Sequence, residues 1–523
     1  MTSGQRYADP FKTIDVDAIL THSDGTSWRV PSFWAGDQTW RVRFAPPKPG
    51  RYTWQTQCSD TANPSLHNQA GTLEAAPYEG NNPLLAHGPL RLASDHGGFE
   101  HADGKPFFWL GDTWWMGLGR RLTWPEQFQR LAADRKAKGF TVVQIVAGLY
   151  PDMPALDDRG ANEAGLPWED AFATINPAYF DMADLRIQWL VHQGIVPCIV
   201  GCWGYYLPLM GINRIKRHWR YLLARWGSYP VIWCLAGEGA MPYYLSETPE
   251  QDRAEQKQGW TEVAKYLRAT DPYRRPVTIH PTEVGRDQVI DDTVLDFDML
   301  QTGHGGHRSV ANTVEKVIAE RDRTPRMPVV VGEVNYEGIL HGTQAEIQRL
   351  TYWSAVLSGA SGYTYGANGL WQVNTEQEPY GPSPHGCSWG DTPWDDAYRL
   401  PGSHQLGLAK RLLTRYAWWR FEPHPEWVDP SGSPANVDAP FAAGIPQQVR
   451  IVYFYQPTFP WTEQQMWVCN LESGTTYRAY FWNPRDGTEH QLGRVNANPD
   501  GRWAIPIQPT MKDWVVVLES TQV

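Results

Sequence analysis

Short apolar runs alternate with longer amphipathic stretches through the middle of the chain. Eight runs of five to seven mostly apolar residues have the length of buried β-strands, at 107–112, 141–146, 195–201, 231–237, 276–280, 297–302, 328–333 and 361–366. Helical periodicity fills the intervals, at 125–139, 177–194, 212–226, 254–269, 284–290, 309–323, 345–359 and 404–416. Eight strand and helix pairs predict an α/β fold, a (β/α)8 TIM barrel. An open doubly wound sheet is the alternative, although no GxGxxG motif follows an early strand to support it.

Both ends of the chain have a different pattern. Residues 1–80 contain short alternating runs such as "TWRVRFAPPKPGRYTW", interrupted by proline and glycine. The runs "QMWVCNLE", "TYRAYFWNPRDG" and "DWVVVLES" repeat this pattern towards the C-terminus. Alternation broken by turn residues is typical of β-sandwiches. We therefore expect three domains: an N-terminal β-sandwich (1–80), the catalytic barrel (81–417) and a C-terminal β-sandwich (418–523).

Composition narrows the class of partner. The net charge is −11, and no run of lysine and arginine is long enough to follow a phosphate backbone, so neither nucleic acid nor a membrane is expected as a partner. The 27 tryptophans and 24 tyrosines outnumber the 16 phenylalanines, which favours flat rings that also carry a polar group. A glycoside or oligosaccharide fits this composition as substrate. The oligomeric state is left open.

Cysteine spacing and hydropathy limit the other classes of site. The six cysteines include no CxxC pair, and Cys198 and Cys202 are expected to pack in the core. We therefore expect no metal and no cofactor. The first residues have no apolar signal segment, and no stretch approaches the roughly 20 apolar residues of a membrane span. The expected location is cytoplasmic.

Polar and aromatic residues follow the ends of the predicted strands. In a TIM barrel the active site is built at the carboxyl ends of the strands. The candidate substrate-binding residues are therefore Asp112, Trp114, Trp115, Gln144, Trp203, His280, His304, Tyr336, Tyr365 and Trp371.

Glutamate ends only two of the eight predicted strands, the fourth at Glu238 and the seventh at Glu333. Strands four and seven face each other across the mouth of a closed barrel, so two inward carboxylates would approach to about 5–5.5 Å, the separation found in retaining glycosidases. We therefore predict Glu238 and Glu333 as the catalytic residues of a two-step displacement.

This chemistry requires two carboxyl groups with unequal pKa values. Glu238, near Trp203, is expected to be desolvated and neutral, whereas Glu333 is expected to stay ionised beside donors such as His304. The glycines on both sides of Glu238 are expected to leave room for a sugar ring to approach the backbone.

Four segments carry a family resemblance. "DGKPFFWLGDTWW", "VIWCLAGEG", "VVVGEVNYEG" and "SGYTYGANGLWQ" resemble the barrel of the apiosidase-like glycoside hydrolases, relatives in clan GH-A. "FWAGDQTWRVRFAPPKPGRYTW" resembles the immunoglobulin-like module ahead of that barrel, and "RAYFWNPRDG" resembles the collagen-binding-type β-sandwich that follows it. The resemblance implies a glycoside hydrolase with Glu238 as acid/base and Glu333 as nucleophile.

The chain departs from the family pattern at strand four. Clan members have asparagine before the acid, where this chain has Gly237, and apiosidases themselves carry aspartate where this chain has Glu238. The sugar therefore stays open among furanosides, pentoses such as apiose, and small pyranosides.

Some candidates have a second interpretation. Asp112 would bind a sugar hydroxyl or cap the following helix. Glu337, four residues past Glu333, is the competing nucleophile. His304 and His307 would suit a metal, but metal-dependent barrel hydrolases usually have His-x-His at the first strand, where this chain has "GDTWW".

Two expectations concern the surroundings of the site. Long loops after the second and third strands, and the segment 366–399, would wall off one side and favour exo action. Trp418 and Trp419 are expected to pack where the barrel meets the C-terminal sandwich.

The alternative function is a non-catalytic carbohydrate-binding protein on a barrel scaffold, which a missing carboxylate at strand four or seven would indicate.

Overall fold

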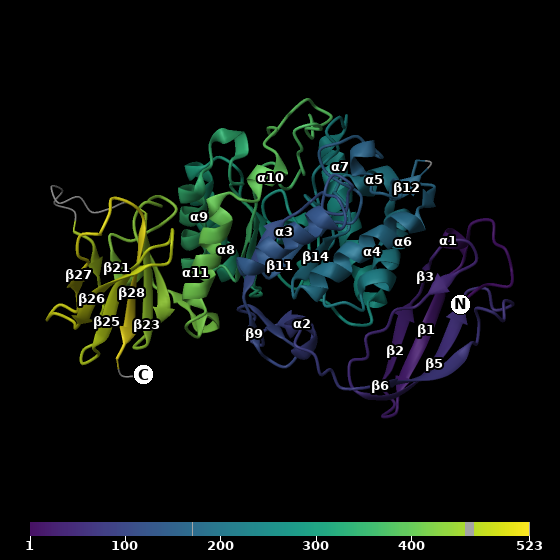
Figure 1. Ribbon diagram of the computed structural model, residues 1–523, viewed down its shortest axis with the longest axis horizontal. Helices are drawn as coiled ribbons and strands as arrows, with labels where there is room; N and C mark the ends of the chain where they lie inside the picture. The colour runs from purple at the N-terminus through teal and green to yellow at the C-terminus, as the bar shows by residue number, and fades with distance from the viewer. Residues whose placement is uncertain (170, 456–464, 522–523) are drawn as a thin grey trace.

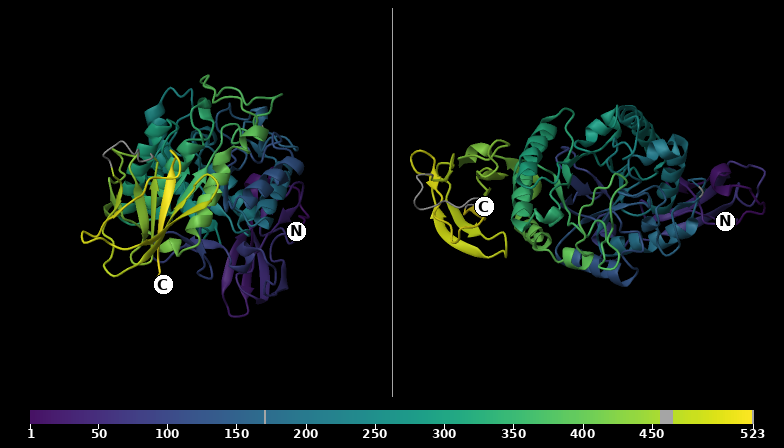
Figure 2. Two further views of the ribbon diagram at one scale, coloured as in Figure 1. Left: turned by 60° about the vertical axis from the view of Figure 1, so that its left-hand side comes forward. Right: turned by 90° about the horizontal axis from the view of Figure 1, so that it is seen from above.

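The computed structural model describes residues 1–169, 171–455 and 465–521. Three regions follow one another along the longest axis: an antiparallel sheet near the N-terminus, a central barrel, and a pair of sheets near the C-terminus (Figure 1). The view from above shows the helices of the barrel as a ring between the two sheet regions (Figure 2). None of the helices in the described ranges is both long and apolar enough to cross a membrane.

The eight predicted strands form one parallel sheet in the order β16-β15-β14-β11-β10-β19-β18-β17. These strands are β10 (Trp109–Thr113), β11 (Val142–Val146), β14 (Val196–Val200), β15 (Ile232–Cys234), β16 (Val277–Thr278), β17 (Asp298–Gln301), β18 (Val329–Glu333) and β19 (Gly362–Tyr365). All of their residues except Gln301 are buried, which explains why each strand appears as a continuous apolar run.

The sheet closes between its first and last strands through Asp296. The backbone N–H of Asp296 donates to the carbonyl of Val277 at 2.8 Å, and the N–H of Val277 donates to the Asp296 carboxylate at 2.8 Å. The predicted (β/α)8 barrel is therefore confirmed.

Helices at the predicted positions surround the sheet. They are α3 (Glu126–Ala137), α4 (Pro177–His192), α6 (Ile212–Trp226), α7 (Pro249–Thr270), α8 (His307–Asp322), α9 (Ala345–Leu357) and α11 (Pro401–Leu413), with the 3-10 turn η2 (Gly285–Gln288) in the place of the fifth helix. Local signals start some of them: the side chain of Asn176 accepts from the N–H of Ala178 ahead of α4, and Pro177 is its first residue. The short helices α5 (Tyr206–Met210) and α10 (Trp394–Ala397) were not predicted, because one turn has no visible period.

The N-terminal region is an antiparallel sheet of order β2-β1-β5-β6 with a separate hairpin. Its strands are β1 (Val16–His22), β2 (Ser27–Pro31), β5 (Gly50–Cys58) and β6 (Ala70–Ala75), and the hairpin is β3 (Phe33–Trp34) with β4 (Trp40–Arg41). Ion pairs attach it to α6, from Arg217 to Asp15 at 2.6 Å and from Arg220 to Asp17 at 2.5 Å.

A small sheet that was not predicted lies under the barrel. It consists of β7 (Leu90–Leu92), β8 (Phe99–His101) and β9 (Pro106–Phe107). The ring of Phe99 packs against Trp109 at 5.3 Å and Phe297 at 5.0 Å between ring centres. The small sheet lies at the end of the barrel opposite the carboxyl ends of the strands (Figure 1).

The C-terminal region has a six-stranded and a three-stranded antiparallel sheet. The first contains β20 (Glu422–Pro423), β22 (Phe441–Ile445), β23 (Val449–Phe454), β25 (Tyr477–Trp482), β26 (Glu489–Val495) and β28 (Trp514–Ser520); the second contains β21 (Val428–Asp429), β24 (Trp467–Val468) and β27 (Trp503–Ala504). Both flanking β-regions are as predicted, while the domain boundaries at 80 and 417 stay predictions.

Helix α9 forms the junction between the barrel and the C-terminal sheets. Trp353 stacks on Tyr453 at 5.8 Å, and Arg349 pairs with Asp513 at 2.6 Å. Trp418 also packs at this end, 4.8 Å from Phe108. Trp419 is 52% exposed, so the expectation of interface packing is correct for Trp418 and not for Trp419.

Candidate active site

A cavity of about 220 Å³ lies at the carboxyl ends of the barrel strands. Its lining combines three carboxylates with aromatic and amide side chains: Trp115, Pro151, Asp152, Trp203, Glu238, Met241, Tyr244, Gln301, His304, Glu333, Tyr336, Ile339, Trp371, His385 and Trp389. The cavity brings together Glu238 and Glu333, which are 95 residues apart in sequence (333 − 238). The direct distance between these two carboxylates stays a prediction.

Glu238 follows β15 in a left-handed backbone conformation, with φ of 45°. The indole N–H of Trp203 donates to its Oε2 at 3.1 Å, and the Nε2 of Gln301 donates to its Oε1 at 2.9 Å. Burial and, next in size, the negative charge of Glu333 raise the pKa of Glu238 to about 7. A carboxyl group with this pKa can give and take a proton near neutral pH.

The glycines beside Glu238 make room for the protein itself and not for a ligand. A Cβ on Gly237 would lie 2.2 Å from the ring of Trp203, and a Cβ on Gly239 would lie 2.4 Å from Ile279. The expected open space for a sugar ring is therefore filled. The Trp203 ring fills the space beside Gly237, and its indole N–H donates to Glu238.

Glu333 ends β18 and is 6% exposed. The Nε2 of His304 lies 2.9 Å from its Oε1, and the Nε2 of His280 lies 3.1 Å from its Oε2. Although burial acts in the opposite direction, these two imidazoles lower the pKa of Glu333 to about 2. Glu333 is therefore ionised throughout the ordinary pH range.

Backbone N–H groups determine which ring nitrogen of each histidine faces Glu333. The N–H of Tyr336 donates to Nδ1 of His304 at 3.2 Å, and the N–H of Glu238 donates to Nδ1 of His280 at 3.4 Å. Because Nδ1 accepts in both rings, the hydrogen of each neutral imidazole is on Nε2, towards the Glu333 carboxylate. His280 thereby connects the backbone of Glu238 to the side chain of Glu333.

Amide replacements of the two carboxyl groups are expected to change stability in opposite directions. An unfolded glutamate has a pKa of roughly 4.3, whereas the pKa of Glu238 in the folded protein is raised to about 7. The folded state therefore loses stability relative to the unfolded state as the pH rises from about 4.3 through about 7. Glu238→Gln should therefore raise the free energy of unfolding at pH 8 by about 1–3 kcal/mol, with little change at pH 4.

The ionisation of Glu333 affects the stability of the folded protein in the opposite direction. Its lowered pKa contributes stability above the unfolded value, and this contribution is lost as the pH falls towards 2. Glu333→Gln should therefore lower the free energy of unfolding at pH 8 by about 1–3 kcal/mol. Urea unfolding of both variants at pH 4 and pH 8 measures the two effects. A loss of stability in Glu238→Gln at pH 8 would contradict the environment described for Glu238.

Five of the candidate binding residues, Asp112, Trp114, Gln144, His280 and Tyr365, are buried and do not line the cavity. The Asp112 carboxylate accepts from Arg135 Nε at 2.5 Å and from the indole N–H of Trp114 at 2.7 Å, with no exposed surface left for a sugar. Gln144 donates to the carbonyl of Gly332 at 2.9 Å, one residue before Glu333. None of the five lines the cavity, so the expectation that they contact substrate gains no support from its lining and stays a prediction.

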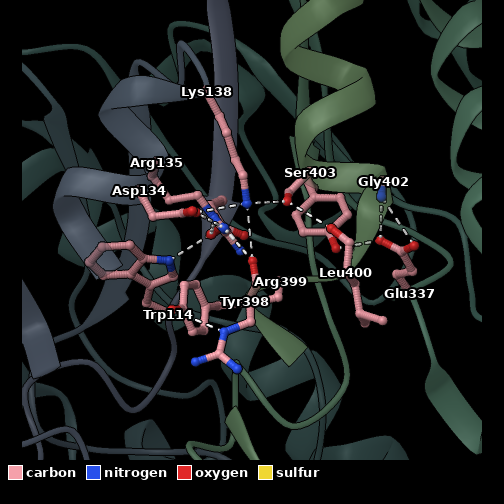
Figure 3. A network of polar contacts seen from close by, with 12 residues as sticks. Trp114, Asp134, Arg135, Lys138, Glu337, Tyr398, Arg399, Leu400, Gly402 and Ser403 are labelled. Atoms are coloured by element: carbon pink, nitrogen blue, oxygen red, sulfur yellow. Dashed lines mark hydrogen bonds and ion pairs between the residues drawn. The ribbon is translucent and has the colours of Figure 1, made fainter. Parts of the chain in front are cut away.

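The partners of Arg135 extend this buried network towards α11. Figure 3 shows Arg135 and Lys138 of the α3 region reaching the carbonyl of Tyr398, while Lys138 also donates to the hydroxyl of Ser403 at 2.9 Å. The network ties β10, α3 and the start of α11 together outside the lining of the cavity.

Glu337 belongs to the same region and not to the cavity. Its carboxylate accepts from the N–H of Gly402 in the first turn of α11 at 3.0 Å (Figure 3) and from the hydroxyl of Tyr365 at 2.6 Å. A carboxylate at a helix N-terminus satisfies unpaired N–H groups and interacts favourably with the helix dipole. The competing assignment of Glu337 as nucleophile therefore loses its support.

Eight lining residues were not predicted: Pro151, Asp152, Met241, Tyr244, Gln301, Ile339, His385 and Trp389. Gln301 ends β17, so the rule that selected the other strand-end residues was sufficient to find it. The others lie in connecting segments, where no hydrophobic period indicates which side chain faces the cavity.

His307 and His304 contact different carboxylates, so the two rings do not form one site. The Nε2 of His307 lies 2.8 Å from Asp438 of the C-terminal region, whereas His304 contacts Glu333. Among the described residues, no three side chains of histidine, cysteine, aspartate or glutamate are grouped as a metal site.

Comparisons with known proteins follow the same layout. A family model described as "Apiosidase-like, catalytic domain" matches residues 94–420, and a domain of unknown function (DUF5060) matches residues 1–59. A solved structure named as a glycoside hydrolase is 22% identical with a TM-score of 0.69, over 85% of this chain and 99% of its own.

A glycoside hydrolase family 5 structure from Bacteroides vulgatus ATCC 8482 is also 22% identical, with a TM-score of 0.70 over 86% of this chain and 96% of its own. A further structure from that organism, 17% identical with a TM-score of 0.66, extends over 100% of this chain and 98% of its own. At these identities the structures show a shared fold. A comparison with curated proteins gave no match.

Proposed function

The chain belongs to the apiosidase-like family of glycoside hydrolases, and from this premise we propose that it removes a terminal sugar with retention of configuration. Glu238 acts as acid/base and Glu333 as nucleophile. The observation that carries the proposal is that one cavity holds two carboxyl groups in unlike environments: Glu238 is buried beside the indole of Trp203, whereas two imidazoles face Glu333. These environments move the pKa values of the two groups apart, to about 7 and about 2. Unequal carboxyl groups of this kind are what a two-step displacement needs.

In the first step an oxygen of Glu333 attacks the anomeric carbon, and the bond from that carbon to the leaving oxygen breaks. Glu238 gives its proton to the leaving oxygen, so the alcohol departs neutral and a glycosyl ester remains on Glu333. In the second step Glu238 takes a proton from water, the water oxygen attacks the anomeric carbon, and the ester bond breaks. Two inversions give net retention.

Gln301 can support both protonation states of Glu238. Its Nε2 donates to Oε1 of Glu238 at 2.9 Å, which suits the ionised carboxylate. Its own Oε1 is buried without a hydrogen-bond partner in the described chain. Rotation of the amide would turn that oxygen towards the protonated form of Glu238, since the two ends of an amide differ only in donating or accepting.

The size and walls of the cavity support exo action on a small sugar. At about 220 Å³ it is smaller than the ~300–1,000 Å³ typical of sites for drug-sized ligands. Pro151 and Asp152 from the loop after β11, and His385 and Trp389 from the segment after β19, line its sides. A terminal pentose or furanose, apiose among them, suits a site of this size in this family.

The stereochemistry of the product tests the proposal. An aryl glycoside panel of pyranosides and furanosides is incubated with the protein, and proton NMR follows the first minutes of hydrolysis. We expect the anomer of the substrate to appear first and to mutarotate later. First release of the opposite anomer would exclude Glu333 as a nucleophile. Absence of hydrolysis across the panel would favour the carbohydrate-binding alternative, against which the presence of both carboxylates now speaks.

A further inference from the structure

The cavity contains a third carboxylate, Asp152, which has no role in the proposed two-step displacement. It lies in the loop after β11 and shares the cavity with Glu238 and Glu333. Its backbone is left-handed, with φ of 54°, a conformation that is costly for a residue with a Cβ. Strained residues persist where surrounding contacts hold them, often in functional sites.

Tyr244 holds this aspartate in place. The N–H of Asp152 donates to the hydroxyl oxygen of Tyr244 at 3.0 Å, and the same hydroxyl donates to Oδ1 of Asp152 at 2.9 Å. The Tyr244 ring is fixed in turn, because it packs edge-on against Tyr205 at 5.5 Å and stacks on His385 at 4.9 Å. The position of the carboxylate is therefore set before any ligand enters.

Among the described residues, the lining of the cavity around Asp152 contains neither lysine nor arginine; His385 is the basic side chain beside it. A half-buried carboxylate without a cation needs neutral donors, and an ionised carboxylate can accept about four hydrogen bonds. Tyr244 supplies one and the indole N–H of Trp389 supplies a second, so capacity remains for donors from a ligand.

Trp371 offers the complementary group. It lines the cavity, is 4% exposed, and its indole N–H has no hydrogen-bond partner among the described residues. A ligand that donates hydrogen bonds to Asp152 and accepts one from Trp371 must carry groups that do both. Sugar hydroxyls have this property, whereas a carboxylate on the ligand can only accept.

We propose that Asp152 is a specificity-determining residue, which accepts hydrogen bonds from hydroxyls of the terminal sugar and restricts the substrate to neutral sugars. This inference rests on the proposed function, since it concerns the same cavity. The ionised carboxylates of Asp152 and Glu333, which share the cavity, would repel the carboxylate of a uronic acid. The substrate class is therefore a neutral glycoside with hydroxyls facing the loop after β11, and glycosides of uronic acids are excluded.

The contact between Asp152 and a sugar hydroxyl is tested by changing the enzyme and the substrate, first separately and then together. kcat/KM is measured for wild type and Asp152→Ala on the best aryl glycoside and on its single deoxy derivatives. Asp152→Ala should lower kcat/KM on the parent glycoside about 10- to 100-fold. In wild type, one deoxy derivative should show a similar loss. In Asp152→Ala that derivative and the parent should differ by less than about threefold, because the hydroxyl and its acceptor form one interaction.

Two further variants separate this contact from a structural effect. Asp152→Asn keeps an acceptor for Tyr244, and it should narrow the preference for a neutral glycoside over the matching uronide about tenfold. Asp158→Asn is the matched control, because this aspartate is in the same loop with its side chain 78% exposed and outside the cavity. It should behave as wild type. The proposal would be overturned if each deoxy derivative lowered kcat/KM by the same factor in wild type as in Asp152→Ala. It would also be overturned if the ratio of kcat/KM for the neutral glycoside to that for the uronide were unchanged in Asp152→Asn.

Binding measurements distinguish failure of this inference from failure of the proposed function. Calorimetric titration of wild type and Asp152→Asn with neutral monosaccharides and with uronic acids needs no turnover. Weaker binding of the neutral sugar to Asp152→Asn supports the role of Asp152 even if no glycoside is hydrolysed. Tighter binding of the uronic acid than of the neutral sugar by wild type overturns it, whatever the catalytic result.

Discussion

Glu333→Ala is expected to lower kcat on aryl glycosides at least about 10,000-fold, because the covalent step loses its attacking atom. Sodium azide should restore part of the rate on a substrate with a good leaving group. In the restored reaction azide attacks the anomeric carbon from the side that Glu333 vacates, and the aryloxide leaves. The product is a glycosyl azide of inverted configuration, which NMR identifies.

Glu337→Gln is the control for this experiment. The amide oxygen can still accept from Gly402 and Tyr365, so the variant should lose stability while its kcat stays within about tenfold of wild type. If Glu337→Gln lost as much activity as Glu333→Ala and responded to azide in the same way, the nucleophile would be Glu337, and the role proposed for Glu333 would be wrong.

Glu238→Ala is expected to lower kcat/KM about 100- to 10,000-fold on glycosides with poor leaving groups, because these need the proton that Glu238 supplies. On a dinitrophenyl glycoside the first step needs no acid, so only the second step is slowed. Azide should accelerate that second step by attack on the glycosyl ester, and the glycosyl azide should have the configuration of the substrate. The contrast with the inverted product of Glu333→Ala separates the two roles.

The pH profile provides a second measure of Glu238. In wild type kcat/KM should fall as the pH rises through about 7, because Glu238 must be protonated, and the acidic limb should lie far lower because the pKa of Glu333 is about 2. The limb near 7 should vanish in Glu238→Ala. Glu247→Ala, an exposed glutamate in the same loop, is the matched control and should keep the wild-type profile. If the fall in kcat/KM near pH 7 persisted in Glu238→Ala, a group other than Glu238 would be responsible for it.

Much of the barrel could be predicted from sequence because its strands are buried on both faces. Each therefore appears as an uninterrupted apolar run, and each predicted run overlaps its strand. The two glutamates could be selected for the same reason, since the rule about strand ends needs only the order of the strands. The strand-end rule has a limit, however. It also selected Asp112, whose partner Arg135 lies 23 residues further on in α3 and makes the aspartate structural.

The loops that complete the cavity could not be predicted in this way. Asp152 and Tyr244 are 92 residues apart in sequence, and their mutual hydrogen bonds exist only because the loops after β11 and β15 meet above the barrel. From sequence, the glycine before Glu238 predicts space for a ligand, because nothing in the local sequence shows that the Trp203 ring fills this space.

The amino-acid sequence by itself determined the order of strands and helices, the parallel sheet and the two glutamates at the ends of its strands, because hydrophobic period and strand order are local or countable properties. Only the tertiary structure decided which neighbours shift the pKa values of Glu238 and Glu333 in opposite directions, which candidates are buried outside the lining of the cavity, and that a third carboxylate lines it. Those properties depend on desolvation and on hydrogen bonds between residues far apart in the chain, which exist only after the barrel has closed.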